Sequence, residues 1–392
     1  MVQGREENGK LILTITGKID SSNANNVEMQ IRDLRNQYPC ESIILDCEQL
    51  EYSSSAGLRV ILRLKQEVED TVLINVNSEL YNILDMTGFT EMMEVHKAYR
   101  VISVEGCEVI GQGANGKIYR IDADTILKVY YDEDALPEID LSRELSRLAF
   151  VNGIPTAISY DVVRVEGGGY GLVFELLNAI SFAKLIISGE KTPDETAKMS
   201  IDLLKLIHSK EVQSDILPDM KAVALNWAEF LKDYLPSDQF EKLIALISAV
   251  PEDAHLVHGD YHLKNVMLQN GETLLIDMDT LSHGHPIFEL ASIYNAYQGY
   301  SLVNHGQTLA FLGIPYETCK AFWRKSLELY LGTQDPEKLD EVEAKAKIVG
   351  LTRVMRREIR RDGFNREDGR ALIEACRKNL AELLPKTDTL LF

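Results

Sequence analysis

One stretch of the chain, residues 255–279 (HLVHGDYHLKNVMLQNGETLLIDMD), concentrates side chains that could handle phosphate and a metal ion. Asp260 can accept the proton of an attacking hydroxyl group, and Asn265, five positions further along the same loop, can bind magnesium. Asp277 ends an apolar strand and can hold a metal ion that bridges phosphate groups. These residues could instead only cap turns and end a strand, but the spacing of all three favours phosphoryl transfer.

A glycine-rich loop lies upstream of this stretch. Gly111, Gly113 and Gly116 have GxGxxG spacing, which dinucleotide-binding folds also use. Such a fold continues directly into a helix, whereas here two strand-like segments follow, 117–121 (KIYRI) and 126–131 (ILKVYY). A glycine loop between two strands is the arrangement in which backbone N–H groups cover the phosphates of ATP. We therefore expect an ATP-binding loop.

Two further features fit a nucleotide site. Lys128 lies within the second strand-like segment, where its amine could reach the α- and β-phosphates, and Glu144 in the helical segment 140–150 is the best candidate to hold it. The alternative is a lysine that extends to solvent at a strand edge and an exposed glutamate. The segment 171–178 (GLVFELLN) resembles the kinase hinge, in which the backbone from Glu175 to Leu177 would bond the adenine edge.

The motif HGDxHxxN followed by IDxD resembles that of the aminoglycoside phosphotransferase and choline kinase-like family, over about residue 109 to the C-terminus. The resemblance implies a catalytic base, two magnesium ligands and a phosphate lysine, which here are Asp260, Asn265 with Asp277, and Lys128. Protein kinases carry a lysine two places after the catalytic aspartate, where this chain has His262. That difference points to a small-molecule hydroxyl as the acceptor. The related phrase GHPIFELA implies that Glu289 braces the catalytic loop.

The first hundred residues alternate strand-like and helix-like segments, which predicts an α/β sheet covered by helices. The expected strands are 11–16, 42–46 and 71–76, and the expected helices are 22–38, 56–67 and 78–86. The phrases GKIDSSNA, ILDCEQLEYSSSAGLRVIL and SELYNILDMTGFTEMMEV resemble a STAS domain, the family of bacterial anti-sigma-factor antagonists.

In the STAS family a serine that opens a helix is phosphorylated by a partner kinase, and the resemblance places Ser55 there. Ser54 stands where the family usually has aspartate, and Ala56 where it has serine or threonine. The alternative is that residues 53–55 (SSS) only cap the free N–H groups of the helix. Ser55 is therefore a candidate phosphosite.

Composition narrows the classes of partner. The formal net charge of −20 disfavours nucleic acid, because like charges repel. No apolar run approaches the ~18 residues that cross a bilayer, and the start MVQGREENGK lacks the apolar core of a secretion signal. The five cysteines form no CxxC pair, which favours free thiols. We expect a cytoplasmic protein that binds neither nucleic acid nor membrane.

The expected architecture is an α/β STAS-like domain (1–100) fused to an α+β two-lobed protein-kinase-like domain, with an N-lobe (101–180) and a helical C-lobe with the acceptor site (181–392). The expected function is ATP- and Mg²⁺-dependent phosphoryl transfer to a small-molecule hydroxyl, with a protein partner as a candidate at the STAS domain. The alternative is a regulatory protein kinase or nucleotide-sensing pseudokinase in an anti-sigma antagonist pathway. The arginines of 351–361 (LTRVMRREIRR) form either a solvated helical face, an anionic acceptor site or a contact with the STAS domain.

Overall fold

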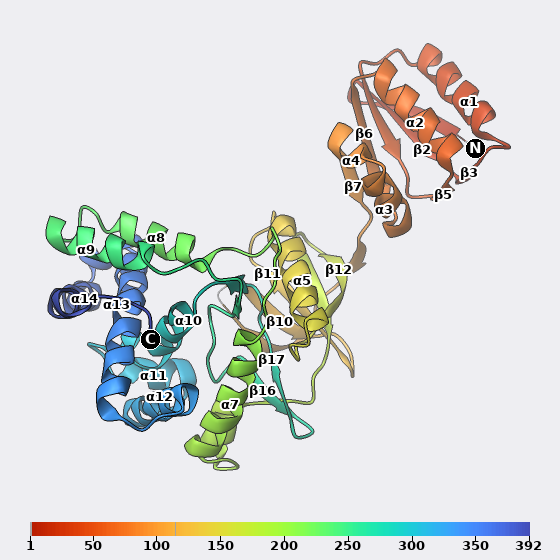
Figure 1. The fold of residues 1–392 in the computed structure, drawn as a ribbon. Helices are drawn as coiled ribbons and strands as arrows, with labels where there is room; N and C mark the ends of the chain where they lie inside the picture. The colour runs from red at the N-terminus through yellow and green to blue at the C-terminus, as the bar shows by residue number, and fades with distance from the viewer. Residues whose placement is uncertain (1, 114) are drawn as a thin grey trace. The chain divides into compact units, whose positions relative to one another are not determined.

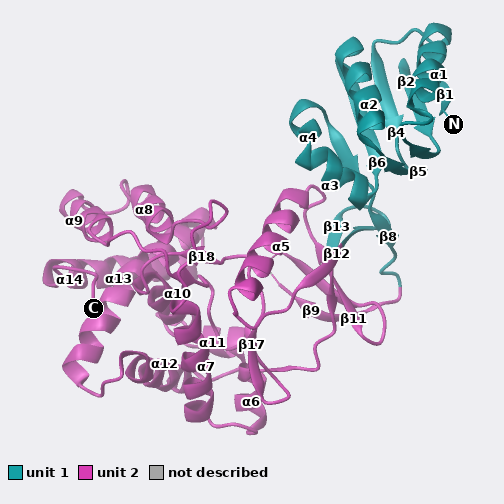
Figure 2. Cartoon of the chain, turned by 45° about the vertical axis from the view of Figure 1, so that its right-hand side comes forward, with its two compact units in different colours: residues 1–105, 162–171 teal, residues 106–161, 172–392 magenta. Residues whose placement is uncertain are grey.

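The computed structural model describes residues 2–113 and 115–392 and divides them into two compact units (Figure 2). Unit 1 contains the chain up to residue 105 together with 162–171, and unit 2 contains 106–161 and 172–392. Each unit has its own hydrophobic core. The core of unit 1 is drawn from residues 2–93, and the main core of unit 2 from residues 145–390.

Unit 1 is an α/β sheet with the strand order β1-β2-β4-β6-β7, in which only β1 and β2 pair antiparallel. Its strands are β1 Val2–Glu7, β2 Lys10–Ile15, β4 Ser42–Asp46, β6 Asp70–Val76 and β7 Val95–Lys97, with β3 Gly17–Ile19 and β5 Leu50–Ser53 forming a separate pair. Its helices are α1 Ala24–Gln37, α2 Ser55–Glu67, α3 Ser78–Met86 and α4 Phe89–Met92.

The sequence pattern explains this sheet. Alternate residues of β2, namely Leu11, Leu13 and Ile15, are buried, as period-two side chains on one face of a strand must be. In α2 the buried residues recur at three-residue spacing, which turns one helical face to the sheet. The expected strands and helices are all present to within two residues at each end. The charged segment Val2–Glu7 was not expected to form a strand, and it pairs at the edge next to β2.

The first part of unit 2 contains a sheet in the order β13-β11-β10-β9, and one long helix lies between β11 and β13 in the chain. Its elements are β9 Glu108–Gln112, β10 Gly116–Arg120, β11 Thr125–Tyr130, β13 Tyr170–Glu175 and α5 Leu136–Val151. The helix begins four residues before the expected segment 140–150, because Pro137 is accepted in its first turn. Within unit 1, β8 Arg100–Ile102 pairs in parallel with residues 163–165 of β12 Ser159–Val165.

The remainder of unit 2 is helical, with short strand pairs between the β9–β13 sheet and the helices (Figure 1). The helices are α6 Phe182–Ser188, α7 Pro193–His208, α8 Met220–Phe230, α9 Ser237–Ser248, α10 Ile287–Tyr297, α11 Gly306–Leu312, α12 Tyr316–Leu331, α13 Pro336–Arg360 and α14 Glu367–Leu383. The short strands are β14 Ile180–Ser181, β15 Leu256–Val257, β16 Val266–Gln269, β17 Glu272–Leu275 and β18 Ser282–His283.

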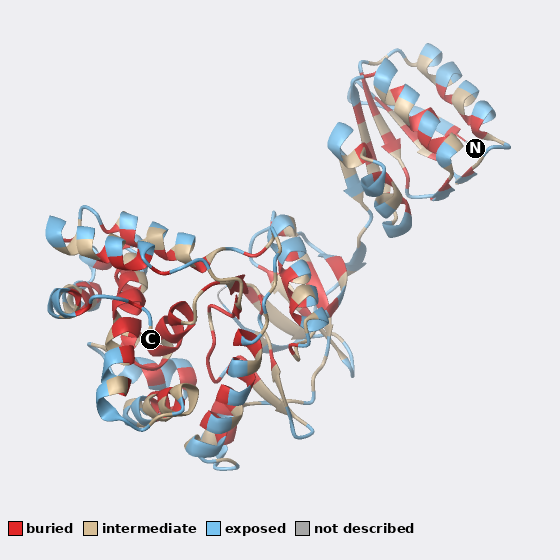
Figure 3. Ribbon diagram, viewed as in Figure 1, coloured by how far each residue is buried: buried red, intermediate tan, exposed pale blue. Residues whose placement is uncertain are grey.

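Helix α10 is the centre of this helical part. It is buried along almost its whole length, and α13 packs along it (Figure 3). Among the described helices, none is both long enough and apolar enough to span a membrane.

Candidate active site

The loop 258–265 joins β15 to β16, and a buried carboxylate binds its backbone. Glu289, in the first turn of α10, is fully buried and accepts hydrogen bonds from the backbone N–H groups of His258 and Gly259. The expectation that Glu289 braces this loop is therefore met. The N–H to Glu289 distances at Gly259 are 3.1 Å, and a carboxylate held by several N–H groups is a strong local restraint.

Gly259 is required by this geometry. Its φ is +80°, and a Cβ atom there would lie 2.7 Å from the carbonyl oxygen of Thr280. The hydroxyl of Thr280 donates to the carbonyl of His258 at 2.7 Å, so the segment after β17 is fastened to the loop at the same place. The residue before Asp260 is thus a glycine because the loop turns sharply against a second chain segment.

Asp260 projects from this loop with its side chain about half exposed (45%). His262 Nε2 lies 3.5 Å from Asp260 Oδ2, and the His262 ring is buried against Phe311. Partial burial raises the pKa of Asp260, but the hydrogen bond and charge of His262, with the charges of Arg353 and His258, outweigh it and lower the pKa to about 2. Asp260 is therefore ionised at neutral pH and oriented from one side.

Asn265 and Asp277 are brought to the same end of the β16–β17 hairpin, in which Val266 pairs with Leu275. The backbone N–H of Ile276 donates to the carbonyl of Asn265 at 2.9 Å, which places Asp277 beside the loop. The Asn265 amide Nδ2 donates to the Asp260 carbonyl at 3.1 Å, and its Oδ1 accepts no hydrogen bond from the described residues. Asp277 has a φ of +67°, a conformation that few residues other than glycine adopt.

Lys128 of β11 reaches both carboxylates of the IDxD motif. Its Nζ lies 2.8 Å from Asp279 Oδ2 and 3.7 Å from Asp277 Oδ1. Ser142 of α5 donates to the other oxygen of Asp279, so three elements meet at this carboxylate. Burial lowers the pKa of Lys128, but the charges of Asp279 and Asp277 outweigh it and hold the pKa above its ordinary value.

The pKa values of the two carboxylates are shifted in opposite directions. For Asp279, burial is outweighed by the charge and hydrogen bond of Lys128 and by the Ser142 hydroxyl, and its pKa is lowered. For Asp277, burial and the neighbouring Asp279 outweigh Lys128, and its pKa is raised. Asp279 is thus the ionised partner of Lys128, while Asp277 carries the carboxylate that an added cation would stabilise.

The expected pairing of Lys128 with Glu144 is not formed, and this expectation is corrected. Glu144 is exposed, and within the part of the chain that the structure describes it has no ion-pair partner. The reason is the phase of α5: its buried face carries Ile139, Ser142 and Leu145, and Glu144 is two positions past Ser142, on another side of the helix.

The glycine loop connects β9 to β10, and residue 114 within it lies outside the described residues. Gly116 is required because a Cβ atom there would lie 2.2 Å from the carbonyl oxygen of Val129, where β10 meets β11. Gly111 packs on Ile118, and Gly113 has open space around it. The loop therefore leads directly into β10, which pairs with β11, the strand that carries Lys128.

The expected hinge follows β13. The N–H of Leu176 is engaged by the carbonyl of Asp124 at 2.7 Å, so the bonds expected to adenine must come from its neighbours Glu175 and Leu177.

Ser55, in unit 1, is the exposed first residue of α2. The helix cap is Ser54, whose hydroxyl accepts from the N–H of Ala56 at 3.2 Å. Of the three serines that the sequence suggests as helix caps, Ser54 is the one that caps α2. In the described chain the Ser55 hydroxyl makes no hydrogen bond.

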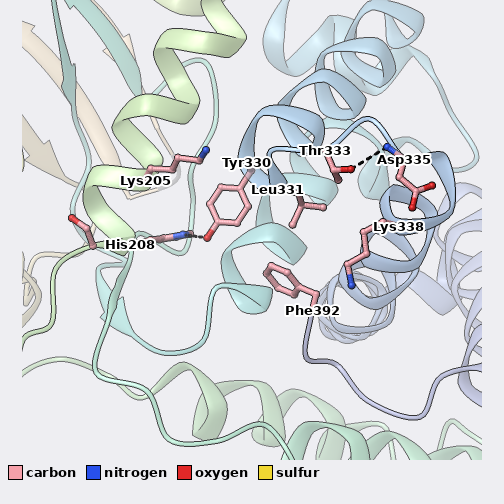
Figure 4. Close-up of a pocket in the computed structure, with 9 residues that line it drawn as sticks. Lys205, His208, Tyr330, Leu331, Thr333, Asp335, Lys338 and Phe392 are labelled. Atoms are coloured by element: carbon pink, nitrogen blue, oxygen red, sulfur yellow. Dashed lines mark hydrogen bonds between the residues drawn. The ribbon is translucent and has the colours of Figure 1, made fainter.

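An open hollow elsewhere in unit 2 is shown in Figure 4. It is lined by residues of α7, α12, the start of α13 and the C-terminus, among them Lys205, His208, Tyr330 and Phe392, and by none of the phosphate-handling residues. His208 Nδ1 lies 2.7 Å from the Tyr330 hydroxyl, and its Nε2 lies 3.9 Å from Glu289. His208 thus lies between this hollow and the carboxylate of Glu289 that supports the loop.

The described part of unit 2 thus combines a glycine loop, a strand lysine and an HGDxHxxN loop above a helical half, which is the arrangement of a kinase-type phosphotransferase. Two family models match the chain. The model described as "STAS domain" matches residues 1–101, and the model described as "Phosphotransferase enzyme family" matches residues 106–316. The second match covers more than half of the 392 residues, and the chain belongs to that phosphotransferase family, with a STAS domain ahead of it.

Individual relatives agree with this division. The chain is 27% identical over 99 residues to an anti-sigma F factor antagonist of Paenibacillus polymyxa, which covers 24% of this chain and 85% of the relative. Among solved structures, the GDP complex of wild-type aminoglycoside 2'-phosphotransferase-IIIa superposes with a TM-score of 0.50 at 13% identity, covering 77% of this chain and 98% of that one. At that identity the likeness shows the fold alone.

The sequence alone does not predict the contacts by which Asp279, Ser142 and Arg353 join this site. Asp279 is visible in the IDxD motif, but its contact with Lys128 spans 151 positions of sequence. Ser142 is a polar residue on the apolar face of α5, which is a readable signal. Arg353 belongs to the arginine cluster of α13, and it donates to the carbonyl of Gly259 at 2.9 Å.

Proposed function

We propose that the chain transfers the γ-phosphoryl group of ATP, with Mg²⁺, to a hydroxyl group of a small molecule. The observation that carries the proposal is the meeting of Lys128, Asp277 and Asp279 beside the 258–265 loop. In this proposal residues 101–180 form the nucleotide lobe and residues 181–392 form the lobe that holds the acceptor.

The nucleotide would lie under the glycine loop. The backbone at Gly111, Gly113 and Gly116 would cover its phosphates, and Lys128 would neutralise charge on them. The backbone of Glu175 and Leu177 would hold the adenine edge. Asp279 and Ser142 act as positioning residues, because they hold the Lys128 amine from two directions.

The donor set fits magnesium, which prefers oxygen ligands and retains several waters. Asn265 offers its free Oδ1. Asp277 offers a carboxylate whose pKa is raised, and a bound divalent cation would lower that pKa again by stabilising the ionised form. When bound, the ion supplies charge neutralisation at the phosphate oxygens.

Asp260 would orient the acceptor. A new O–P bond forms between the acceptor oxygen and the γ-phosphorus, the bond to the bridging oxygen of ADP breaks, and the hydroxyl proton passes to Asp260 or to water. With a pKa of about 2, Asp260 is a weak base. Because the transition state of phosphoryl transfer is loose, its main contribution is a hydrogen bond that aims the hydroxyl.

The experiment is an ATP-consumption assay with small-molecule alcohols, run on the parent and on Asp260→Asn. Turnover should fall about 10²–10⁴-fold while Mg–ATP affinity, measured by calorimetry, changes little. Equal loss of affinity and turnover would place Asp260 in the nucleotide site and contradict the assignment.

A second function is carried by the STAS domain. Its relative is an anti-sigma factor antagonist, and Ser55 is exposed at the start of α2 with its hydroxyl free. A phosphate at a helix start is favoured by the free N–H groups there. In this candidate the chain is regulatory and Ser55 is phosphorylated, by this kinase domain or by a partner.

The test is mass spectrometry of the full chain after incubation with Mg–ATP, alone and with a cell extract. Phosphate on Ser55 that is missing from Ser55→Ala supports the regulatory role. No phosphate at Ser55 under either condition argues against it.

A further inference from the structure

The last two turns of α13 carry four arginines on one face. Arg353, Arg356, Arg357 and Arg360 stand at i, i+3, i+4 and i+7, the spacing at which side chains of a helix are neighbours. We call these four residues the arginine face. Its first member donates from Nη1 to the carbonyl of Gly259 at 2.9 Å and lies 3.1 Å from the Ser292 hydroxyl.

The arginine face forms no ion pair among the described residues, although the charge of Arg353 acts on Asp260. In a chain with 61 acidic and 41 basic residues, none of the four forms an ion pair within the described residues. Other arginines of this unit do: Arg324 pairs with Asp340 at 2.6 Å, and Arg366 pairs with Glu358, which itself lies on α13. The pKa of Arg356 is lowered by burial and by the like charge of Arg360. A solvated face that balances acids would show the opposite arrangement.

Three of the four guanidinium groups instead lie over aromatic rings. Arg353 lies 5.3 Å from the centre of the Trp227 ring, Arg356 lies 5.6 Å from that of Phe230, and Arg357 lies 4.8 Å from that of Tyr300. A ring covers the face of a guanidinium group and leaves its in-plane N–H donors available. Arg356 Nε is buried and has no hydrogen-bond partner in the described residues.

The arginine face begins at the candidate catalytic loop. The carbonyl that Arg353 binds belongs to the residue before Asp260, and the charge of Arg353 helps to lower the pKa of Asp260. Arg356 and Arg357 follow one turn later, about 5–6 Å further along the axis. A molecule whose hydroxyl meets Asp260 would therefore have its remainder within reach of these two side chains.

We propose that the arginine face is the acceptor subsite and that the acceptor carries an anionic group, a carboxylate or a phosphate ester, near its reacting hydroxyl. This inference rests on the proposed phosphoryl transfer and names its substrate class. Planar guanidinium groups with free N–H edges bind both anions bidentately. A polycationic acceptor would be repelled by the same face.

The test compares neutral and anionic members of one acceptor skeleton: glycerol with glycerate and with glycerol 3-phosphate, and glucose with gluconate. Mg–ATP turnover is measured for the parent, for Arg357→Gln and for the double variant R356Q/R357Q. The control is K320Q/K378Q, which removes the same charge at two exposed lysines that have no ion pair in the described chain. If the double variant folds poorly, the single variant Arg357→Gln still gives a result, because Arg357 is exposed and its replacement should not disturb folding.

We expect the anionic members to have the higher kcat/KM, and R356Q/R357Q to lower it about 30-fold through KM while the neutral members change less than about threefold. The control should not differ from the parent. Glycerate and glycerol 3-phosphate separate a carboxylate from a phosphate ester. Equal use of neutral and anionic members, unchanged by the arginine variants, overturns the anionic acceptor while phosphoryl transfer stands.

A second readout does not need turnover. Calorimetry without nucleotide measures binding of 3-phosphoglycerate to the parent, the double variant and the control. Binding that is weakened about tenfold or more in R356Q/R357Q alone supports the subsite even if no phosphoryl transfer is found. Binding that is absent in the parent, or equal in all three proteins, contradicts it, and a failure of the proposed function would instead appear as no Mg–ATP binding.

Discussion

Asp279, rather than Glu144, should be the carboxylate on which Lys128 depends. The change that tests this is Asp279→Asn, which removes one charge and keeps the shape of the side chain. In the structure the side chains of Lys128 and Asp279 are only 19% and 17% exposed and lie 2.8 Å apart. Asp277 remains 3.7 Å from the same amine, so the lysine would keep one counter-charge in the variant.

The expected cost follows from this geometry. A hydrogen bond to a charged group contributes about 1.5–3 kcal/mol, and the remaining Asp277 keeps the loss within that range rather than at that of a fully unpaired buried charge. If the lysine is misplaced to the same extent in the transition state, kcat/KM for Mg–ATP falls about 10- to 150-fold. Glu144→Gln is the matched control, and its effect should stay within about twofold because Glu144 is exposed and unpaired in the described residues.

A coupled assay of ADP release, run over a range of Mg–ATP concentrations, measures both variants. Thermal unfolding of each protein separates misfolding from loss of the lysine position. If Glu144→Gln costs as much as Asp279→Asn, Lys128 must exchange Asp279 for Glu144 when nucleotide binds, and the reasoning from this pairing is refuted.

Three other changes have expected outcomes. Gly259→Ala should lower the unfolding temperature and abolish turnover, because the added Cβ would lie 2.7 Å from the Thr280 carbonyl oxygen. The left-handed backbone conformation at this position also costs a residue other than glycine of order 1–3 kcal/mol. An unfolding temperature in calorimetry equal to that of the parent would contradict this. Glu289→Gln should destabilise unit 2 by about 1–3 kcal/mol in a denaturant titration, since the amide removes the negative charge that faces two N–H groups and replaces one accepting oxygen by an NH2 group. Mg–ATP affinity, measured by calorimetry, should begin to weaken on acidification above the ordinary carboxyl pKa of about 3.9, because protons compete for Asp277, whose pKa is raised. This added pH dependence should be missing in Asp277→Ala.

The pKa of Asp260 sets a separate pH expectation. The lowered value of about 2 means that its carboxylate contributes to stability above the ordinary value of about 3.9 and that this contribution is lost as the pH falls from there toward 2. A loss of turnover on acidification that begins above the ordinary carboxyl pKa, seen in a pH profile of the coupled assay, should therefore come from a group other than Asp260.

Local sequence determined the elements and the order of the motifs. Period-two burial in β2 and three-residue spacing in α2 are properties of short segments, and the structure has them where the sequence predicted them. The HGDxHxxN and IDxD motifs predicted a loop and a hairpin in sequence, and Asn265 and Asp277 are neighbours there because β16 and β17 pair directly. Such contacts need only one turn of chain.

Tertiary structure decided which distant residues meet. Whether Lys128 faces Asp279 or Glu144 depends on the rotation of α5 against the β9–β13 sheet, which is set by the packing of its whole apolar face and not by either residue. The spacing of the arginines of α13 is equally consistent with a solvated helical face and with a binding site. What distinguishes them is the set of rings from α8 and the α10–α11 connection, together with the carbonyl of Gly259, that long-range packing brings to that face of the helix.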